Sequence, residues 1–206
     1  QLFVFKKVNG QWAQTQTIQL PAGSRFTSQR QKLELSDGGL IATARHDGDW
    51  QLMLYQYVNG QFVQEATIPA IDFYSPIAMD GHLFVEGSGD GSGEARQARV
   101  YERIEGNWTL VQTILPENNA STRFGNSVAI DGSLMLVGDF TELSDGQKSG
   151  AAYLYQRDDN GVFNFVRRLS LPAPLHEAYF GATVRLLGQT ALVYQSWLTR
   201  TLHFYN

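Results

Sequence analysis

The sequence predicts an all-β protein, a β-propeller of about four blades in which each blade is a four-stranded antiparallel meander. Short runs of β-branched and aromatic residues alternate with Asp-Gly and Asn-Gly turns along the whole chain. These landmarks recur at an interval of about 50 residues. Helical 3.6-residue periodicity is absent over any useful length. One small sheet cannot bury both of its faces, so we expect the repeated sheets to stack around an axis.

The clearest unit is 121–173. We expect strands at 126–130, 134–138, 151–157 and 162–171, with turns at Asp131-Gly132 and Asn160-Gly161. The run Leu134–Gly138 is apolar throughout, as in a strand that is buried on both faces. Pro172 ends the last strand because proline has no N–H for the next ladder bond.

The remaining units follow the same order. Residues 1–21 match only the second half, with strands at 2–7 and 12–20 around the Asn9-Gly10 turn. Residues 24–70 predict strands at 33–35, 40–44, 52–57 and 62–68, and 71–117 predict strands at 83–87, 98–103 and 108–115 after an Asp80-Gly81 turn. Residues 178–206 predict strands at 183–187, 191–195 and 201–205.

Aromatic residues mark the expected core. One opens each unit, and these are Phe26, Phe73, Phe124 and Phe180. Others lie on third strands, where we expect them to pack between blades: Phe3, Phe5, Tyr55, Tyr57, Tyr101, Tyr153, Tyr155 and Phe204.

The blade count leaves a choice open. Blades 24–70, 71–117 and 121–173 are complete, and 178–206 with 1–21 would make the fourth. That blade has two candidates for its third strand, Leu2–Lys7 and Thr201–Tyr205. We therefore prefer a closed four-bladed ring in one domain, and keep as alternatives an arc of a larger propeller, for example a seven-bladed one, or terminal strands that pair with neighbouring molecules.

Composition excludes several classes of function. The net charge of −4 gives no electrostatic reason to expect nucleic acid or an anionic membrane as a partner. No apolar run approaches the roughly 18–20 residues of a membrane-spanning helix. The chain has no cysteine, and therefore no disulfide or thiolate metal site. Scarce lysine and abundant glutamine we interpret as signs of a secreted or surface protein.

The segment FGNSVAIDGSLMLVG at Phe124–Gly138, followed by SGAAYLYQR at Ser149–Arg157, resembles the FG-GAP repeat of integrin-α-type propellers, and the bacterial branch most of all. Phe180-Gly181 keeps the motif, whereas 24–117 keep only the aromatic residue and the turns. The resemblance implies an extracellular propeller that acts in adhesion or ligand binding, and some relatives bind sugars.

Calcium is not carried over from that resemblance. Calcium-binding repeats have a D-x-D/N-x-D-G loop after the first strand, whereas this chain has only a two-residue turn such as Asp131-Gly132. Such a turn cannot supply the six or more oxygens that a calcium ion requires. We therefore expect no metal and no cofactor.

The loops between second and third strands are the candidate binding surface, because loops on a rigid scaffold commonly carry binding residues. They are Arg45–Gln51, Ser88–Gln97, Asp139–Ser149 and Ser196–Thr199, and we expect all of them at one end of the molecule. The candidate ligand-binding residues are Arg45, His46, Asp49, Trp50, Asp139, Glu142, Asp145 and Trp197. The competing interpretation is that these loops are solvated connectors whose Gly and Asp residues only make turns.

No catalytic residue is predicted. The four histidines are scattered without an H-E-x-x-H motif, and no G-x-S-x-G motif is present. Our first hypothesis is therefore a non-catalytic extracellular or cell-surface propeller that binds a protein or glycan. The alternative is a structural subunit of a filament or surface assembly, which self-associates through its terminal strands.

Overall fold

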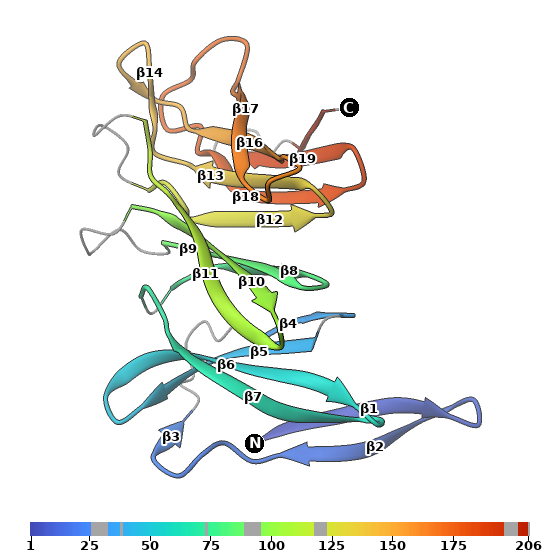
Figure 1. Cartoon of the computed structure of the whole chain (residues 1–206). Helices are drawn as coiled ribbons and strands as arrows, with labels where there is room; N and C mark the ends of the chain where they lie inside the picture. Colours follow the sequence, from blue (N-terminus) through green and yellow to red (C-terminus); the bar gives the residue numbers. More distant parts are fainter. Residues whose placement is uncertain are drawn as a thin grey trace. The chain divides into compact units, whose positions relative to one another are not determined.

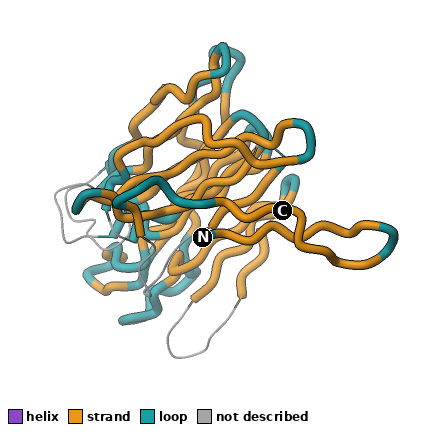
Figure 2. Tube along the Cα trace, turned by 90° about the horizontal axis from the view of Figure 1, so that it is seen from below, coloured by secondary structure: helices purple, strands orange, loops and turns teal. Residues whose placement is uncertain are grey.

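The computed structural model describes residues 1–25, 33–37, 39–72, 74–88, 96–117, 123–195 and 202–205. Every regular element in these ranges is a β-strand, and strands are joined mostly by short loops (Figures 1 and 2). The predicted all-β class is therefore confirmed. A helix with the length and apolarity needed to cross a membrane does not occur in these ranges. Among the aromatic residues expected to open the units, Phe26 and Phe73 lie outside the described residues.

The chain forms two compact units. The first comprises Gln1–Leu35 and Gly39–Pro69, and the second comprises Ser36–Gly38 and Ala70–Asn206. The predicted arrangement of four blades in one ring, with 1–21 and 178–206 in a shared blade, stays a prediction.

The first unit contains two antiparallel sheets. One is the hairpin of β1 (Leu2–Val8) and β2 (Gln11–Ile18). In the other, β3 (Ser24–Arg25), β5 (Gly39–His46), β6 (Asp49–Val58) and β7 (Gln61–Pro69) follow in that order, and β4 (Leu33–Ser36) also pairs with β5. The Asn9-Gly10 turn forms as predicted, because both residues have the positive φ of a type I′ turn, 49° and 84°. The Asn160-Gly161 pair of the second unit differs from the prediction: only Gly161 has a positive φ, 85°, and the pair lies in a longer loop between Arg157 and Phe163.

A shared core holds these two sheets together. Ile18 of β2 packs with Leu40, Met53 and Tyr55 of the larger sheet, and Leu2 and Val4 of β1 lie against them. The amide of Gln16 adds a two-way clamp: its Nε2 donates to the carbonyl oxygen of Phe62 at 2.7 Å, and its Oε1 accepts from the N–H of Phe62 at 2.8 Å.

The second unit contains two complete meanders and a three-stranded sheet (Figure 1). The first meander is β8 (Ile77–Asp80), β9 (Leu83–Gly87), β10 (Ala98–Ile104) and β11 (Asn107–Ile114). The second is β12 (Ser127–Asp131), β13 (Leu134–Asp139), β16 (Ala151–Arg157) and β17 (Phe163–Leu169), with the small hairpin of β14 (Leu143–Ser144) and β15 (Gln147–Lys148) between β13 and β16. The last sheet is β18 (Phe180–Leu187), β19 (Thr190–Gln195) and β20 (Leu202–Tyr205).

Close backbone contact explains the FG motif of the second unit. Phe124 and Phe180 are fully buried and enter the apolar layers between successive sheets. The following glycine brings its carbonyl oxygen against the end of the second strand of the preceding sheet. A Cβ added to Gly138 would lie 2.2 Å from the oxygen of Gly181, so only glycine fits there.

The Asp-Gly turns differ from the prediction by one residue. Asp131 still pairs with Leu134, so the two-residue loop is Gly132-Ser133, and Gly132 takes the positive φ of 58°. The aspartate is therefore the last strand residue. Its carboxylate accepts the N–H of Gly188 in the next sheet at 2.6 Å, as that of Asp80 accepts the N–H of Gly132 at 2.6 Å.

The predicted aromatic core is correct for some residues and wrong for others. Tyr55, Tyr101, Tyr153 and Tyr155 are buried. Phe3 and Phe5 are more than half exposed, because they alternate along β1 with Leu2 and Val4, which occupy the core-facing side. Tyr57 and Phe204 are also exposed.

The second unit buries one carboxyl group with incomplete hydrogen bonding. Glu86 of β9 is fully buried, and its Oε1 accepts the N–H of Ile71 at 2.6 Å. Its Oε2 has no hydrogen-bond partner among the described residues. Burial, with a smaller contribution from nearby Asp72, raises the pKa of Glu86 to about 7 against the opposing effects of Ile71, Ser75 and Arg99.

Candidate functional site

Four predicted site residues lie on one hairpin rather than in a long loop. Asp47 and Gly48, with φ of 49° and 100°, form a two-residue type I′ turn between β5 and β6. Arg45 is therefore opposite Trp50, and His46 is opposite Asp49, in regular strand register. The expected long loop Arg45–Gln51 is thus wrong, because the Asp-Gly pair inside it closes the hairpin tightly.

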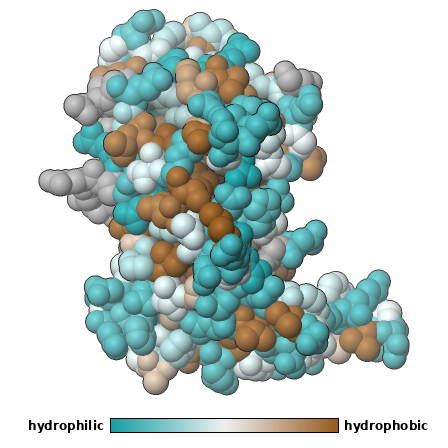
Figure 3. Space-filling view, in the orientation of Figure 1, coloured by the Kyte–Doolittle hydropathy of each residue, from teal (hydrophilic) through white to brown (hydrophobic). Residues whose placement is uncertain are grey.

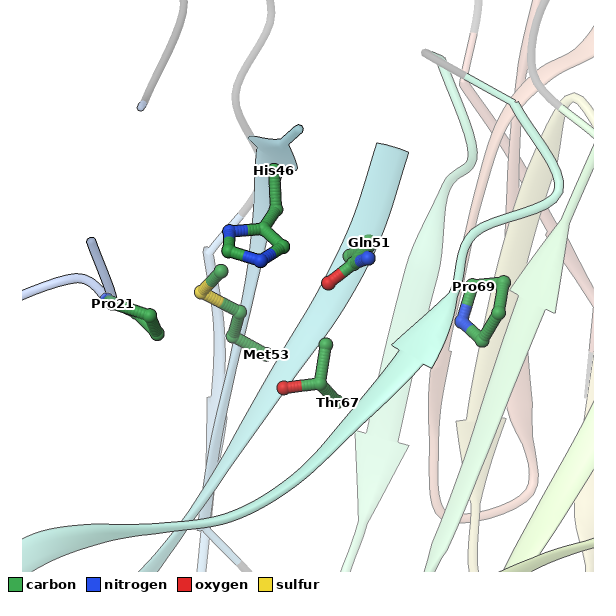
Figure 4. Close-up of a pocket in the computed structure, with 6 residues that line it drawn as sticks. All are labelled: Pro21, His46, Gln51, Met53, Thr67 and Pro69. Atoms are coloured by element: carbon green, nitrogen blue, oxygen red, sulfur yellow. The ribbon is translucent and has the colours of Figure 1, made fainter. Parts of the chain in front are cut away.

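This hairpin borders an open hollow of about 430 Å³ in the first unit. The hollow is lined by Pro21, His46, Gln51, Met53, Thr67 and Pro69. Figure 4 shows the imidazole near the thioether of Met53, with the Gln51 amide and the Thr67 hydroxyl on the adjoining strands. The hollow therefore combines hydrogen-bonding groups with the apolar surface of Met53 and the two prolines. Such a lining can accommodate a small polar ligand or a side chain of a partner.

His46 is held in place from two sides. Its Nδ1 forms a hydrogen bond with Ser24 Oγ at 2.8 Å, and its Nε2 lies 3.4 Å from a carboxylate oxygen of Asp47. Arg45 is held in the turn, because its Nε donates to the carbonyl oxygen of Gly48 at 2.9 Å. Of the four predicted residues, only His46 lines the hollow, and Gln51 and Thr67 were not predicted.

In the second unit, the predicted residues Asp139 and Glu142 are buried, and they brace the loop that contains them. Asp139 accepts hydrogen bonds from the N–H and the hydroxyl of Thr141, both at 3.2 Å. Glu142 accepts from Arg168 Nε at 2.8 Å and from the hydroxyl of Tyr153. Burial raises the pKa of Tyr153 far above its usual value, and its bond to Glu142 adds to the rise.

The braced loop carries the β14–β15 hairpin at its tip. Asp145 begins the Asp145-Gly146 turn with a φ of 50° and is exposed, as are Leu143 and Lys148. Asp145 is therefore the one member of this predicted trio whose carboxylate reaches solvent. The remaining predicted site residue, Trp197, lies outside the described residues, as does 89–95 of the loop Ser88–Gln97.

A cluster of three side chains beside this loop was not predicted. The Phe140 ring lies beneath the guanidinium of Arg123, 5.9 Å from its centroid, and meets Tyr179 at 5.6 Å and 78°. Arg123 and Tyr179 each precede an FG pair, so they are equivalent residues of successive repeats. The repeat pattern alone could have shown that Arg123 and Tyr179 occupy equivalent positions. It does not predict that Phe140 lies between them.

A second hollow, of about 330 Å³, lies in the second unit near the first hairpin turns of two neighbouring sheets. Arg157 Nη2 and Glu102 Oε2 form an ion pair there at 2.7 Å, and His82 Nε2 lies 3.5 Å from Glu102 Oε1. In the described ranges, this hollow included, no three His, Asp or Glu side chains come together as they would around a metal ion. The expected absence of calcium and cofactor remains a prediction.

Comparison with solved structures places the fold. A protein from Lactobacillus plantarum matches with a TM-score of 0.53 and 15% identity, over 99% of this chain and 63% of the other. A provisionally assigned 6-phosphogluconolactonase from Bacteroides fragilis matches with a TM-score of 0.53 and 13% identity, over 98% and 62%. A functionally unknown protein from Desulfotomaculum acetoxidans has a TM-score of 0.49 at 14% identity, over 85% and 54%.

The chain thus has a β-propeller-type fold, as predicted. Within it, residues 108–155 match the FG-GAP repeat family, so the predicted repeat is confirmed at the segment that contains FGNSVAIDG. Curated protein sequences gave no match. The chain spans less than two thirds of the length of the Lactobacillus and Bacteroides proteins, and the number of blades stays a prediction.

Proposed function

We propose that this protein is a non-catalytic binding propeller, located outside the cell or at its surface, that recognises a protein or glycan through the loops between second and third strands. The observation that carries the proposal is the β14–β15 hairpin, which is exposed at its tip and fixed at its base. A segment of this kind can contact a ligand without first losing much conformational freedom.

The base of the hairpin is fixed by buried charge. Glu142 is 6% exposed and bonds to side chains of both β16 and β17, through Tyr153 and Arg168. Strands β16 and β17 therefore both fix the position at which the loop leaves the sheet. The tip then presents Leu143, which is 45% exposed, together with Asp145 and Lys148. An apolar side chain and two opposite charges on one hairpin are suitable contacts for a polar partner surface.

The extracellular location is supported by the FG-GAP repeat, since such repeats are typically extracellular. Whether a ligand is bound can be tested with glycan arrays and with pull-downs from extracellular fractions. The triple variant L143A/D145A/K148A should lose at least tenfold in affinity for any ligand that wild type binds. The control Lys7→Ala changes an exposed lysine in the first unit and should retain binding. A ligand bound equally by wild type and the triple variant would refute this site.

We propose a non-catalytic protein although three side chains are arranged in the order of a catalytic triad. Ser24, His46 and Asp47 form a Ser-His-Asp line beside the first hollow. The Asp47 side chain is 77% exposed, so water competes strongly for its interaction with the imidazole and the carboxylate holds the ring only weakly. We therefore expect no labelling of Ser24 by a fluorophosphonate probe. Stoichiometric labelling that disappears in His46→Ala would overturn this part of the proposal.

Self-association is the second candidate function, and the β1–β2 hairpin favours it. Phe3, Phe5, Val8 and Trp12 are 47–73% exposed on this hairpin, where hydrophobic side chains reach the surface (Figure 3). Exposed apolar groups of this kind are common at contacts between proteins. Light scattering over a wide concentration range tests the idea: wild type should associate, and the variant F3S/F5S/W12S should stay monomeric. A wild type that remains monomeric at millimolar concentration would exclude this function.

A further inference from the structure

We infer that Arg123, Phe140 and Tyr179 form a binding site for an acidic saccharide, in which a uronate ring packs against the aromatic side chains and its carboxylate pairs with the guanidinium. The inference rests on the proposed binding function and names a ligand class for the same end of the second unit.

The site is assembled from two successive repeats. Arg123 precedes the Phe124-Gly125 pair, Tyr179 precedes Phe180-Gly181, and Phe140 follows β13 between them. The side chain of Asn126 joins the same segments: its Oδ1 accepts the N–H of Phe140 at 3.1 Å, and its Nδ2 donates to the carbonyl oxygen of Ala182 at 3.2 Å. The backbones that carry the two aromatic rings are therefore held in place before a ligand arrives.

Arg123 is the first observation that points to an acidic ligand. Its side chain is half-buried and lies over the Phe140 ring. Within the described ranges, its guanidinium makes no ion pair and no hydrogen bond, although it carries five N–H donors. Two acidic side chains of the loop, Asp139 and Glu142, are buried and bond to Thr141 and Arg168 instead. The planar cation is thus available for a bidentate carboxylate.

Tyr179 is the second observation. It has a φ of 52°, in the left-handed region that glycine and asparagine adopt far more readily than tyrosine. A tyrosine at such a position indicates that its ring is needed where it is. The ring stands at 78° to Phe140, so the two aromatic side chains make a corner instead of a stack.

A pyranose fits this corner better than a peptide side chain does. The C–H groups of a sugar ring carry a small positive charge and are attracted to the negative face of an aromatic ring. A neutral sugar would use only the rings, and would leave the guanidinium without a partner. A uronic acid satisfies both parts, because its carboxylate lies on the same ring that makes the aromatic contact.

The experiment uses isothermal titration calorimetry of the full chain with three uronate oligosaccharides: oligogalacturonate, oligomannuronate and oligoglucuronate. Each is compared with its methyl ester, which has the same ring and no charge. We expect at least one acid to bind wild type at least tenfold more tightly than its ester. Arg123→Gln should remove that preference, and Arg185→Gln, an exposed arginine on β18, should keep it.

Tyr179→Gly separates the ring from the backbone. Glycine accepts the positive φ, so this variant should fold at least as well as wild type and still lose at least tenfold in affinity for both acid and ester. Failure of all three acids to bind at millimolar concentration overturns the inference. So does binding that is unchanged in Arg123→Gln and Tyr179→Gly. A ligand lost only in L143A/D145A/K148A would leave the proposed function standing and reject the uronate site.

Discussion

Replacing the buried Glu86 with glutamine should stabilise the protein, and increasingly so as the pH rises from about 4.5 to about 7. The pKa of this carboxyl is raised from 4.5 to about 7 in the folded state. The folded protein therefore holds a proton that the unfolded chain releases, and stability falls as the pH rises through this window. The shift corresponds to about 3 kcal/mol that is present below pH 4.5 and lost above pH 7.

Glutamine removes the titration and keeps an oxygen that can accept the N–H of Ile71. The measurement is urea denaturation of wild type and Glu86→Gln at several values between pH 4 and pH 8, followed by tryptophan fluorescence. Trp108 contributes to this signal, and its ring lies 5.1 Å from Phe84 on β9. The difference in unfolding free energy should rise across the window and then level off. Glu105→Gln removes the same charge from an exposed turn and is the control. A difference that stays flat from pH 4 to pH 8 would refute the reasoning.

Three further predictions concern the bonds between and within sheets. Glu142→Gln weakens a buried ion pair and should cost about 2–4 kcal/mol in urea denaturation, with faster amide exchange across the β14–β15 hairpin; unchanged exchange would contradict the brace. Gln112→Ala leaves the N–H and carbonyl of Phe163 without the amide that binds them at 2.8 and 2.9 Å, and should cost about 1–3 kcal/mol. Gly138→Ala forces a Cβ to within 2.2 Å of a backbone oxygen and should cost about 3 kcal/mol or more, whereas Gly132→Ala meets open space and should cost about 1 kcal/mol through its positive φ alone; equal melting temperatures for these two variants would contradict the close approach.

The strands were predictable because their signals are local. The runs at 83–87 and 151–157 are each bounded by residues that turn the chain, and β9 and β16 have the same limits. The expected loop at 45–51 is wrong because polar residues do not by themselves indicate a loop. Its Asp47-Gly48 pair is itself a hairpin turn, which leaves the flanking charged residues in strands. A second turn signal inside a polar segment should therefore be interpreted as a further strand pair.

The site was less predictable, because burial depends on partners that are distant in the sequence. Glu142 looked like a loop carboxylate, and only Tyr153 and Arg168 on later strands make it internal. Phe140 is similar, since its neighbours come from two other repeats. Residue type and local pattern could not distinguish the side chains that hold a loop from those that face solvent.

The aspartates at the first hairpins link successive repeats in one direction along the chain. Asp80 supplies the acceptor for the hairpin that follows it by one repeat, and Asp131 does the same for the next. The first hairpin of each of these repeats therefore bonds to an aspartate of the preceding repeat. A duplication or deletion preserves these hydrogen bonds only when it adds or removes whole repeats. Attempts to lengthen or shorten this protein should therefore place their junctions at equivalent positions of two repeats.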